Sequence, residues 1–571
     1  MEWEYCQKQN QAEDLAKKLD ISNFLATLLL NRGFIDEDEI KKFISPQLSD
    51  FRDPFDFENM EAVIEKILEI KRKKSKIFIY GDYDVDGITS AVFLTKAFKE
   101  LDIDVEYYIP NRMEEDYGLD KHNLKYMKSR GAELVITVDT SISSIEDIRY
   151  GRSIGIDVII TDHHKSAKEK EDDEVLYVNP KLSEKYSFKY LAGAGVALKV
   201  AQALYIKLGI SMERLYKYLD IVMIGTVADV VPIVDENRII VKEGLKRLKD
   251  TEVKGLVYMM KYLKFQHKTI TTTDISYFIA PLINSLGRIG TSRIGAKFFM
   301  EENEVAIYDI IEEMKRSNKR RRELEKEIYD EAVSLVEKKL TAPYKGIFLV
   351  SKKWHPGVIG IVSSRLSIKY RVPVVLISLR NGVGKASSRS VSGINIFNIF
   401  KDMSHLLTRF GGHDLAAGFI AEEYNLNKIR QFFMNAVENL NESNERKSLS
   451  IDMEFPVEKI SEETIQDIEI LSPYGIENGV PLLVDRNLEL LDVKKFGVDN
   501  KHFSGIIQKE GKRFSVVGFD LARYIHETGY KLQRFDIVYY PERNQFKGEE
   551  SIQLKIKDIK VKDEFYELFS E

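Results

Sequence analysis

Residues 77–87 read IFIYGDYDVDG, and this stretch decides the fold class. Four apolar residues at 77–80 predict a short buried strand, the loop after it carries Asp82, Asp84 and Asp86, and a helical segment follows. Similar β-rich runs recur at 105–110, 134–139, 158–161 and 175–178, with helix-length segments between them. This alternation predicts βαβ units built around a parallel sheet.

The three loop carboxylates at 82, 84 and 86 indicate a metal site. They repel one another unless a cation offsets their charge, and carboxylate oxygens suit Mg²⁺ or Mn²⁺. An EF-hand calcium loop also opens with D-x-D-x-D-G, but the twelfth position counted from Asp82 is Phe93 rather than Glu, and a strand precedes the loop. An acidic turn without a metal is the remaining alternative.

Further acidic and imidazole groups follow other segments of the same module. Asp139 follows the run LVITV, the triplet Asp162-His163-His164 follows VIIT, and Asp229 follows an apolar stretch that reads as a helix. Ligand-binding loops of open parallel sheets lie at the carboxyl ends of the strands. Carboxylates mixed with imidazoles at this density suggest two divalent ions bridged by one carboxylate, an arrangement used in phosphoryl transfer.

The remainder of the chain predicts several further parts. We expect an N-terminal helical region at 1–74, the α/β module at 75–300, one long helix at 301–340, a second α/β module at 341–447 and a small β-barrel at 448–571. The long helix loses its apolar stripe at KRSNKRRR (315–322), which predicts a helix that bridges two domains across solvent.

Composition narrows the class of protein. The chain has 571 residues, a net charge of −6 and one cysteine, which excludes an intrachain disulfide and a thiolate metal cluster. It shows no secretion signal and no apolar run of the roughly 18 residues that a membrane span needs. We therefore expect a cytoplasmic protein without a membrane partner, in which phosphate binding depends on local basic patches or metal ions.

These motifs resemble those of a known family. GDYDVDG, VDT at 138–140, TDHH at 161–164 and Asp229 resemble the DHH phosphoesterase superfamily, and within it the RecJ family of bacterial single-strand-specific 5′→3′ exonucleases. Motifs outside the core match the RecJ family in order along the chain: LAGAGVALK (191–199), HPGVIGIVSSRL (355–366), SSRS (387–390), FGGHDLAAG (410–418) and LSPYGIENGVP (471–481). The resemblance thus implies a DHH catalytic domain at 75–300, a DHH-associated substrate-binding domain at 341–447 and an OB-fold-like nucleic-acid-binding domain at 448–571.

The resemblance also implies roles for individual residues. Asp84 and Asp139, with Asp82, would hold a first metal ion, while Asp86, Asp139, His163 and Asp229 would hold a second, so that Asp139 bridges the two. Asp162 would orient an imidazole, and His164 would face the scissile phosphate. Substrate contacts would come from Ser388, Arg389 and His413 and from Arg112 and Arg288, although an ordinary ion pair is an alternative for either of the last two.

The implied activity is hydrolysis of single-stranded DNA from the 5′ end to mononucleotides by a two-metal mechanism with Mn²⁺ or Mg²⁺, in DNA repair and recombination. We expect a monomer whose candidate protein partners are a single-strand-binding protein and a helicase. Two alternatives stay open: a DHH phosphodiesterase acting on nanoRNA or cyclic dinucleotides, and a non-catalytic RecJ-like DNA-binding factor. The length of the chain argues against the first, and the presence of every candidate ligand argues against the second.

Some positions depart from the family pattern. Ser141 stands where glycine is common, Asp116 where glycine is usual, and Leu282 where arginine is usual. None of these removes a candidate metal ligand, but each bears on how the DNA strand is gripped. The partial dinucleotide fingerprint at 193–198 does not follow the first strand of the sheet, so we set a nicotinamide cofactor aside.

Overall fold

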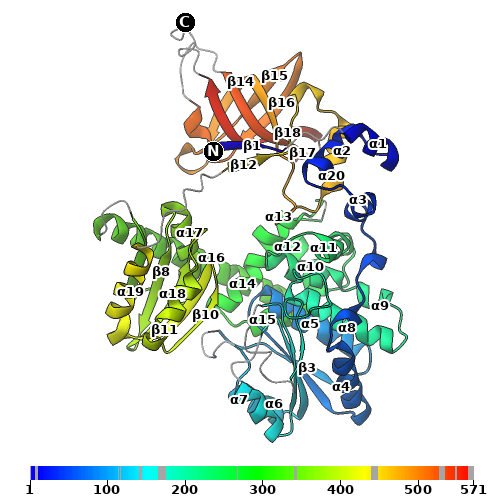
Figure 1. Ribbon diagram of the computed structural model, residues 1–571, viewed down its shortest axis with the longest axis vertical. Helices are drawn as coiled ribbons and strands as arrows, with labels where there is room; N and C mark the ends of the chain where they lie inside the picture. The colour runs from blue at the N-terminus through cyan, green and yellow to red at the C-terminus, as the bar shows by residue number, and fades with distance from the viewer. Residues whose placement is uncertain are drawn as a thin grey trace. The chain divides into compact units, whose positions relative to one another are not determined.

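The computed structural model describes residues 2–6, 11–112, 115, 118–140, 145–164, 175–266, 268–339, 344–438, 448–525, 534–546 and 549–562. The chain forms two compact units (Figure 1). Unit 1 contains Met1–Phe51, Pro232–Lys242 and Glu445–Glu571, and unit 2 contains Arg52–Val231 and Glu243–Asn444. Among the described helices, none combines the length and the apolar character needed to cross a membrane.

Unit 2 contains the parallel sheet that the sequence predicts. Its strands are β2 (Lys76–Gly81), β3 (Val105–Tyr108), β4 (Ala132–Val138), β5 (Asp157–Thr161) and β6 (Leu176–Val178). They lie in the order β3-β2-β4-β5-β6, and every neighbouring pair is parallel. All carboxyl ends therefore meet at one edge of the sheet, which is where the acidic motifs begin.

Helices cover both faces of this sheet. The helices α4 (Met60–Lys73), α5 (Val85–Lys99) and α8 (Gly193–Lys207) pack on one face, and α6 (Lys121–Ser129) and α7 (Ile145–Ser153) pack on the other. The side chains of α5 and α8 are buried almost throughout, which explains why their sequences lack an amphipathic pattern. With both faces covered, the strands between them are nearly continuous apolar runs.

A helical layer follows in the chain. It consists of α9 (Glu213–Tyr216), α10 (Leu219–Ala228), α11 (Asp235–Leu248), α12 (Lys254–Tyr262), α13 (Thr272–Asp274), the π-helical turn η4 (Ile275–Ile279), α14 (Ala280–Ile289) and α15 (Arg293–Met300). Short 3-10 turns lie at η1 (Leu48–Asp50), η2 (Pro54–Asp56), η5 (Ser404–Leu406), η6 (Glu423–Asn425), η7 (Val457–Lys459), η8 (Val498–Asn500) and η9 (Ala522–Tyr524). The apolar helix α10 packs against α5 and α8 and ends at Ala228, directly before Asp229.

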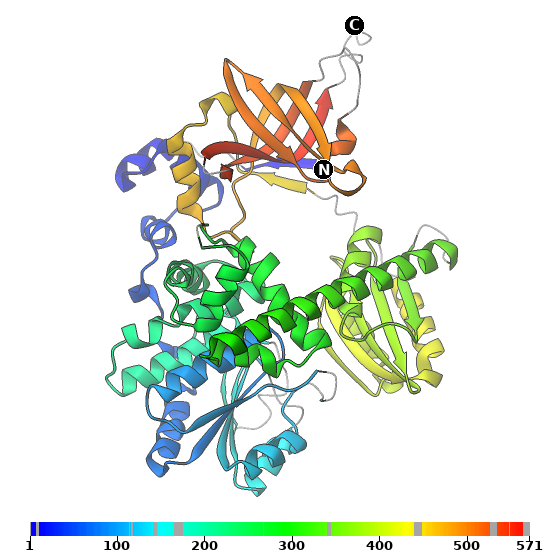
Figure 2. The ribbon, with the colours of Figure 1, turned by 180° about the vertical axis from the view of Figure 1, so that it is seen from behind.

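The long helix expected at 301–340 is α16 (Glu304–Lys339), and Figure 2 shows it joining the two α/β modules of unit 2. The expectation that its basic middle crosses solvent holds for one side of the helix only: Lys315 and Arg316 are exposed, but the opposite side is covered. Where the apolar stripe lapses, Ser317 and Asn318 are buried, and the Ser285 hydroxyl donates to the Met314 carbonyl at 3.2 Å. Small polar side chains let α14 pack closely against α16, so the buried face continues without apolar residues.

The second module of unit 2 is a five-stranded mixed sheet. Its elements are β7 (Ile347–Ser351), α17 (Ile359–Tyr370), β8 (Val374–Arg380), β9 (Val383–Arg389), α18 (Ile396–Asp402), β10 (Arg409–His413), β11 (Ala416–Glu422) and α19 (Leu426–Glu438). The strand order is β10-β11-β9-β8-β7, with only β7 and β8 parallel. The α/β class predicted for this module is confirmed.

Unit 1 contains the β-barrel expected at the C-terminal end. It is built from β13 (Met453–Glu454), α20 (Glu462–Leu471), β14 (Leu483–Phe496), β15 (His502–Lys509), β16 (Lys512–Gly518), β17 (Arg534–Phe546) and β18 (Glu549–Lys562). The strands run in the order β14-β15-β16-β18-β17, and the pairing of β14 with β17 closes the barrel. Closure removes exposed sheet edges.

The N-terminal segment belongs to the same unit as the barrel. It contains β1 (Glu2–Tyr5), α1 (Ala12–Leu19), α2 (Asn23–Asn31) and α3 (Glu37–Ile44), and β1 pairs in parallel with β12 (Ser448–Ile451). Leu25 and Leu28 share one apolar core with barrel residues such as Ile537. The described part of 1–51 is thus held by residues more than 400 positions away in the chain. The sequence-based domain boundaries stay predictions.

Candidate metal centre and anion-binding residues

The acidic loop at 82–86 is compact because glycine stands at both of its ends. A Cβ on Gly81 would lie 2.6 Å from the Gly87 carbonyl oxygen, and a Cβ on Gly87 would lie 2.5 Å from the Asp82 nitrogen. The Asp84 side chain accepts from the Gly87 N–H at 3.1 Å and caps α5. The strand-to-helix turn therefore folds the three carboxylates into a small volume.

Two further candidate ligands, Asp139 and His163, come from neighbouring strand ends, and Asp162 directly precedes His163. Asp139 follows β4 with φ +56°, a left-handed conformation that aspartate tolerates better than branched residues, and its N–H donates to the Thr161 carbonyl at 3.1 Å. Asp162 follows β5, and its N–H donates to the Val178 carbonyl at 3.1 Å. The strand ladder is thereby extended by one bond at each position, which sets the direction in which the motif residues leave the sheet.

The last candidate ligand, Asp229, comes from the helical layer. It follows α10 directly, and Gly225 one turn earlier lets α10 approach α5: a Cβ there would lie 2.3 Å from Thr89 Oγ1 and 2.8 Å from Asp86 Oδ1. Gly193 has the same role at the start of α8, where a Cβ would lie 2.5 Å from the Cβ of Asp139. Sequence reasoning missed both glycines, although Gly193 lies in the quoted motif LAGAGVALK.

The start of α8 also holds a ligand in place. The backbone N–H of Gly193 donates to Asp86 Oδ2 at 2.6 Å, and that of Ala194 donates to Asp86 Oδ1 at 2.9 Å. These two donors fix the orientation of the Asp86 carboxylate, and they supply backbone N–H groups near its negative charge. The glycine-rich segment that resembles a dinucleotide fingerprint is therefore a carboxylate-positioning turn.

The structure brings all six candidate metal ligands together. His163 Nε2 lies 3.1 Å from Asp139 Oδ1, 3.5 Å from Asp229 Oδ2 and 3.9 Å from Asp86 Oδ2. Ligand atoms within 4.8 Å of one another form three groups: Asp82, Asp84 and Asp139; Asp86, His163 and Asp229; and Asp139, His163 and His164. The assignment of individual ligands to two ions stays a prediction, and Asp139 is positioned to serve both.

The polar atoms of this cluster fit a bound metal. Asp139 Oδ1 and both ring nitrogens of His163 are buried without a hydrogen-bond partner in the described residues. Burial and then the neighbouring carboxylates raise the pKa values of Asp82, Asp139 and Asp229 well above their usual range, and raise the pKa of Asp86 to about 7. A cation would offset both the missing hydrogen bonds and the mutual repulsion, and carboxylate with imidazole ligands suits Mn²⁺ and accommodates Mg²⁺.

The two adjacent histidines differ in charge. Burial and the charge of His164 lower the pKa of His163 to about 3, so that His163 is neutral and able to ligate a metal. Burial alone would lower the pKa of His164, but the hydrogen bond from Nδ1 to Asp162 Oδ1 at 2.8 Å and the nearby carboxylate charges raise it to about 9. Asp162 therefore holds His164 as an imidazolium in the ligand-free protein.

The second α/β module contributes His413, whose ring stacks on His164 of the first module. In the sheet register Ala416 of β11 lies opposite both His413 of β10 and Arg389 of β9. The His413 ring is parallel to the His164 ring, with centroids 5.7 Å apart and an interplanar angle of 7°. Gly412 has φ +133°, and a Cβ there would lie 2.4 Å from the Ala417 Cα, so glycine is required before His413. The GGH motif is thus a structural requirement as well as a candidate binding site.

Ser388 needs a correction, because the structure does not bring it to the same face as Arg389. Successive residues of a strand point to opposite faces, and Ser388 is fully buried with its hydroxyl donating to the Ala417 carbonyl at 2.6 Å. Ser387 lies on the Arg389 side: a Cβ on Gly360 of α17 would lie 2.9 Å from Ser387 Oγ and 3.9 Å from Arg389 Nη2. The period of the strand could have pointed to Ser387 had its register been known.

Arg288 and Arg389 each lie within electrostatic range of Arg112. Burial and then the charge of Arg112 lower the pKa of Arg288 to about 10 and lower that of Arg389. Arg288 donates to the Gly357 carbonyl at 3.4 Å, Arg389 donates to the Ser388 carbonyl at 2.7 Å, and Arg112 lies 4.8 Å from the centre of the Tyr83 ring. Within the described residues none of the three has a carboxylate partner, so the ion-pair alternative finds no support and the cluster is suited to an anion.

Three family models match this chain. The N-terminal domain of the DHH family matches residues 76–226, the DHHA1 domain matches 343–439, and the RecJ OB domain matches 451–558. The single-stranded-DNA-specific exonuclease RecJ of Bacillus subtilis strain 168 is 33% identical over 568 residues, which cover 99% of this chain and 71% of that protein. The chain belongs to the RecJ family.

Other members of the RecJ family agree in sequence and structure. The RecJ exonuclease of Haemophilus influenzae is 28% identical and aligns with 92% of this chain and 94% of its own length. The crystal structure of Thermus thermophilus RecJ with Mn²⁺ has a TM-score of 0.83 at 24% identity, covering 98% of this chain and 80% of that one, which confirms the fold. A structure of exonuclease RecJ bound to manganese matches at TM-score 0.60 and 29% identity, covering 69% of this chain and 97% of that one.

Among the departures from the RecJ family pattern, Leu282 is buried in α14. Ser141 and Asp116 lie outside the described residues. The motif HPGVIG at 355–360 supplies contacts that sequence reasoning did not assign: besides Gly360 beside Ser387, a Cβ on Gly357 would lie 2.2 Å from the Arg288 carbonyl oxygen. The residues at and just before the start of α17 therefore pack closely against the backbone of Arg288 and lie beside Ser387 and Arg389.

Proposed function

We propose that this chain is an exonuclease that hydrolyses single-stranded DNA from the 5′ end to mononucleotides, using two Mn²⁺ or Mg²⁺ ions. The observation that carries this proposal is the buried cluster of Asp86, Asp139, His163 and Asp229, in which Asp139 Oδ1 and both ring nitrogens of His163 lack a hydrogen-bond partner in the described residues. The neighbouring ring of His164 stacks on His413 of the second module. The names of the bacterial relatives support the same activity.

The two groups of candidate ligands have distinct roles in this proposal. Asp82, Asp84 and Asp139 would hold one ion, and Asp86, Asp139, His163 and Asp229 the other. Bound metal ions lower the pKa of water toward neutrality and neutralise charge that develops on the phosphate. The N–H groups of Gly193 and Ala194 keep the Asp86 carboxylate oriented, so that the ligand does not rotate away from the ion.

The side chains around the ligands position the strand and supply a proton. His164 Nδ1 is engaged by Asp162, so the proton on Nε2 is available to the 3′-oxygen as it leaves the phosphorus. Burial and the charge of His164 lower the pKa of His413, which keeps that ring neutral beside the imidazolium. Arg389 and His413 would hold the terminal 5′-phosphate, with Arg112 and Arg288 contacting the backbone. Holding a strand end distinguishes an exonuclease from an endonuclease.

Several further properties belong to this proposal. The proposal includes a monomeric state, since the candidate ligands assemble within one chain without a residue from a second copy. The bacterial relatives are named for action on DNA, which in bacteria lies in the cytoplasm, and this supports a cytoplasmic role in DNA repair and recombination. A single-strand-binding protein and a helicase are the candidate partners because both expose or hold the single strand that the enzyme needs.

The test uses oligonucleotides labelled at either end, single-stranded or as blunt duplexes, with Mn²⁺ or Mg²⁺. We expect early release of a 5′-labelled mononucleotide from the single strand alone. Arg389→Ala should reduce the advantage of a 5′-phosphate over a 5′-hydroxyl end, whereas Arg430→Ala on the exposed side of α19 should not. Preferential 3′ release, or equal rates on the duplex, would contradict the proposal and favour a small-substrate phosphodiesterase. Binding without release under every metal condition would favour the non-catalytic alternative.

A further inference from the structure

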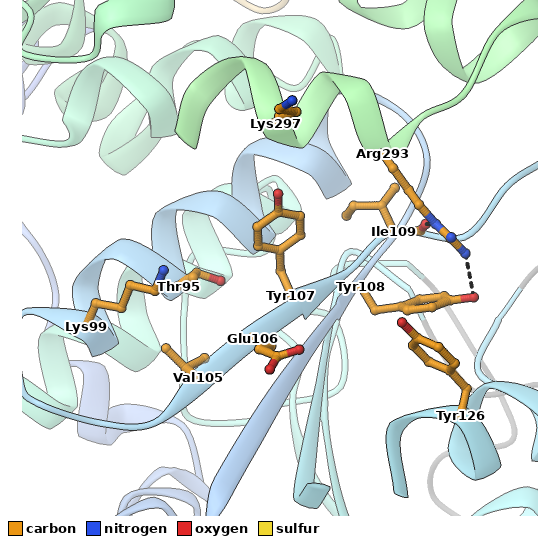
Figure 3. Close-up of a pocket in the computed structure, with 10 residues that line it drawn as sticks. All are labelled: Thr95, Lys99, Val105, Glu106, Tyr107, Tyr108, Ile109, Tyr126, Arg293 and Lys297. Carbon is orange, nitrogen blue, oxygen red and sulfur yellow. Dashed lines mark hydrogen bonds between the residues drawn. The ribbon is translucent and has the colours of Figure 1, made fainter. Parts of the chain in front are cut away.

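A cavity of about 410 Å³ lies along the open edge of the parallel sheet, away from every candidate metal ligand. It is bounded by the outer edge of β3, by the C-terminal half of α5, by α6 and by α15 (Figure 3). Its volume is in the range of about 300–1,000 Å³ that is typical of small-molecule sites. None of its lining residues has a role in the reaction proposed above.

The lining side chains leave the cavity positively charged. The lining contains three cationic side chains, Lys99, Arg293 and Lys297, and one carboxylate, Glu106. Glu106 is already paired with Lys76 at 2.6 Å and with Arg130 at 3.2 Å. Within the part of the chain that the structure describes, Lys99 has no carboxylate partner. Arg293 and Lys297 pair with carboxylates outside the cavity lining, Glu115 at 3.3 Å and Glu301 at 3.6 Å, and both of these ion pairs are long and partly exposed.

The same cavity presents aromatic rings beside these cations. Figure 3 shows the Tyr107 side chain rising from β3 toward Lys297, and the Tyr108 and Tyr126 rings beside each other beneath Arg293. The centres of the last two rings are 5.3 Å apart, and Tyr126 is 44% exposed, so its ring offers an open face. The Arg293 Nη2 donates to the Tyr108 hydroxyl at 2.8 Å, which holds the cation over this aromatic surface.

The backbone of β3 adds hydrogen-bonding groups. β3 pairs only with β2 in the described sheet, and the Asp104 carbonyl accepts from the Ile77 N–H at 2.9 Å. Because backbone groups of alternate residues point to opposite sides of a strand, those of Val105 and Tyr107 point to the unpaired edge. The cavity therefore combines cations, an open aromatic face and unpaired backbone donors and acceptors.

We propose that this cavity is a nucleotide-binding site separate from the metal centre, in which a base stacks on Tyr126 and a phosphate contacts Arg293 and Lys297. Phosphate oxygens complement the cations, an aromatic ring supplies sequence-tolerant stacking, and backbone groups at the open edge contact the base. The nucleotide comes either from a free mononucleotide or from one unit of a longer strand. The proposal concerns binding alone and does not require the hydrolysis proposed above.

The first experiment measures binding of deoxyadenosine 5′-monophosphate to the full chain in EDTA, with deoxyadenosine and inorganic phosphate as partial probes. We expect Tyr126→Ala and Lys297→Glu each to weaken binding of the monophosphate about tenfold or more, the first by loss of stacking and the second by loss of charge. Lys428→Glu, an exposed lysine on α19, is the matched charge control and should bind as the unaltered chain does. Tyr126→Phe should retain binding, because its ring still stacks.

The second experiment locates the bound nucleotide and identifies its source. A photoreactive 8-azido derivative of the monophosphate should label peptides that contain Tyr107, Tyr126 or Arg293, and label only near Arg389 or His413 would overturn the proposal. A single-stranded oligothymidylate with blocked ends is then titrated into the same variants. If the variants weaken binding of the monophosphate alone, the cavity is assigned to free nucleotides. If they weaken binding of both the monophosphate and the oligothymidylate, it is assigned to the strand. If they weaken binding of neither ligand, the proposal is overturned. If the chain has no exonuclease activity, binding of the monophosphate, photolabelling and the oligothymidylate titration can still be measured. Failure of the proposed function is therefore distinguishable from failure of the proposed nucleotide site.

Discussion

Two regions of this molecule bury charged side chains, but they differ in whether the protein supplies the hydrogen-bond partners of those side chains. At the metal centre of unit 2, Asp139 Oδ1 and both nitrogens of His163 are buried without a partner in the described residues, and several carboxylates crowd one another. In unit 1, Arg238 of α11 is only 1% exposed and also lacks a carboxylate partner among the residues that the structure describes. Its guanidinium, however, is fully engaged by the backbone.

The contacts of Arg238 account for all its donor nitrogens. It donates to carbonyls of two segments: Phe43 of α3 at 2.7 Å, and the continuous run 470–473 at and beyond the end of α20, where the acceptors are Ile470 at 3.2 Å, Leu471 at 3.1 Å, Ser472 at 2.9 Å and Pro473 at 3.3 Å. Its Cζ lies 4.0 Å from the centre of the Phe43 ring. These carbonyls include those at the end of a helix, which need external donors.

The difference separates a structural charge from a functional one. A buried ion whose hydrogen bonds are complete within the protein ties segments together, and nothing further has to bind it. A buried cluster with unpaired atoms is stable only because the rest of the fold holds it, and such sites are found where a ligand completes the set. Each prediction below tests whether one of the two regions behaves according to this distinction.

The largest expected effect is on hydrolysis. Asp139→Asn should reduce the rate of hydrolysis by about a thousandfold or more, because a neutral amide at the shared position weakens the binding of both proposed metal ions. The measurement is nucleotide release from single-stranded DNA with Mn²⁺. Asp104→Asn, an exposed aspartate of the same module, should keep its activity. In EDTA the Asp139→Asn protein should unfold at the same or a higher temperature, and clear destabilisation would assign Asp139 to the structural class.

The next effect is on stability. Arg238→Met should lower the free energy of unfolding of unit 1 by about 3–5 kcal/mol, because it leaves buried carbonyls without donors. Chemical denaturation followed by a barrel-located probe measures it. Arg486→Met, at a half-exposed arginine of the same unit that pairs with Glu454 at 3.4 Å, should cost less than about 1 kcal/mol. Equal losses in the two variants would remove the distinction drawn for Arg238.

A metal titration compares the two regions directly. Mn²⁺ at about a hundred times its dissociation constant should stabilise unit 2 by about 2.7 kcal/mol, since only the folded chain assembles the ligands. The shift in melting temperature should be retained in Arg238→Met and lost in Asp139→Asn. An undiminished shift in Asp139→Asn would show that Mn²⁺ binds elsewhere.

The smallest expected effect is a dependence on pH in EDTA. The pKa of His164 is raised to about 9, so its stabilising contribution is complete below its unfolded pKa and is lost as the pH rises through 9. Asp86, with its pKa raised to about 7, adds a loss of the same sign up to that pH. Unit 2 should therefore lose about 1–2 kcal/mol between about pH 6.5 and 9. Burial lowers the pKa of Arg238 only to about 10, so unit 1 should change little in this range. Rising stability of metal-free unit 2 would contradict a charged His164 and a protonated Asp86 at the lower pH.

How much of the site was predictable differs from residue to residue. Asp82, Asp84 and Asp86 follow a strand within a few positions, so local pattern alone placed them in one loop. The structure shows that Asp139, Asp162 and His163 follow adjacent parallel strands, as the alternating pattern predicts. Ser388 was predicted as a substrate contact, but its side chain is buried, because successive strand residues point to opposite faces and a motif does not reveal which face is covered.

The sequence by itself determined the local elements: the strand–loop–helix at 76–99, the long helix α16, the barrel-forming tail and the identity of the metal-type ligands. Each of these depends on residues that are close in the chain, whose periodicity and turn chemistry are visible without the fold. Only the tertiary structure decided that Gly193 and Gly225 let α8 and α10 close around Asp86, that Arg238 joins α3 to α20, and that the first helices pack on the barrel. Those contacts join residues far apart in the chain, and they follow from packing and steric fit, which appear only when the segments meet.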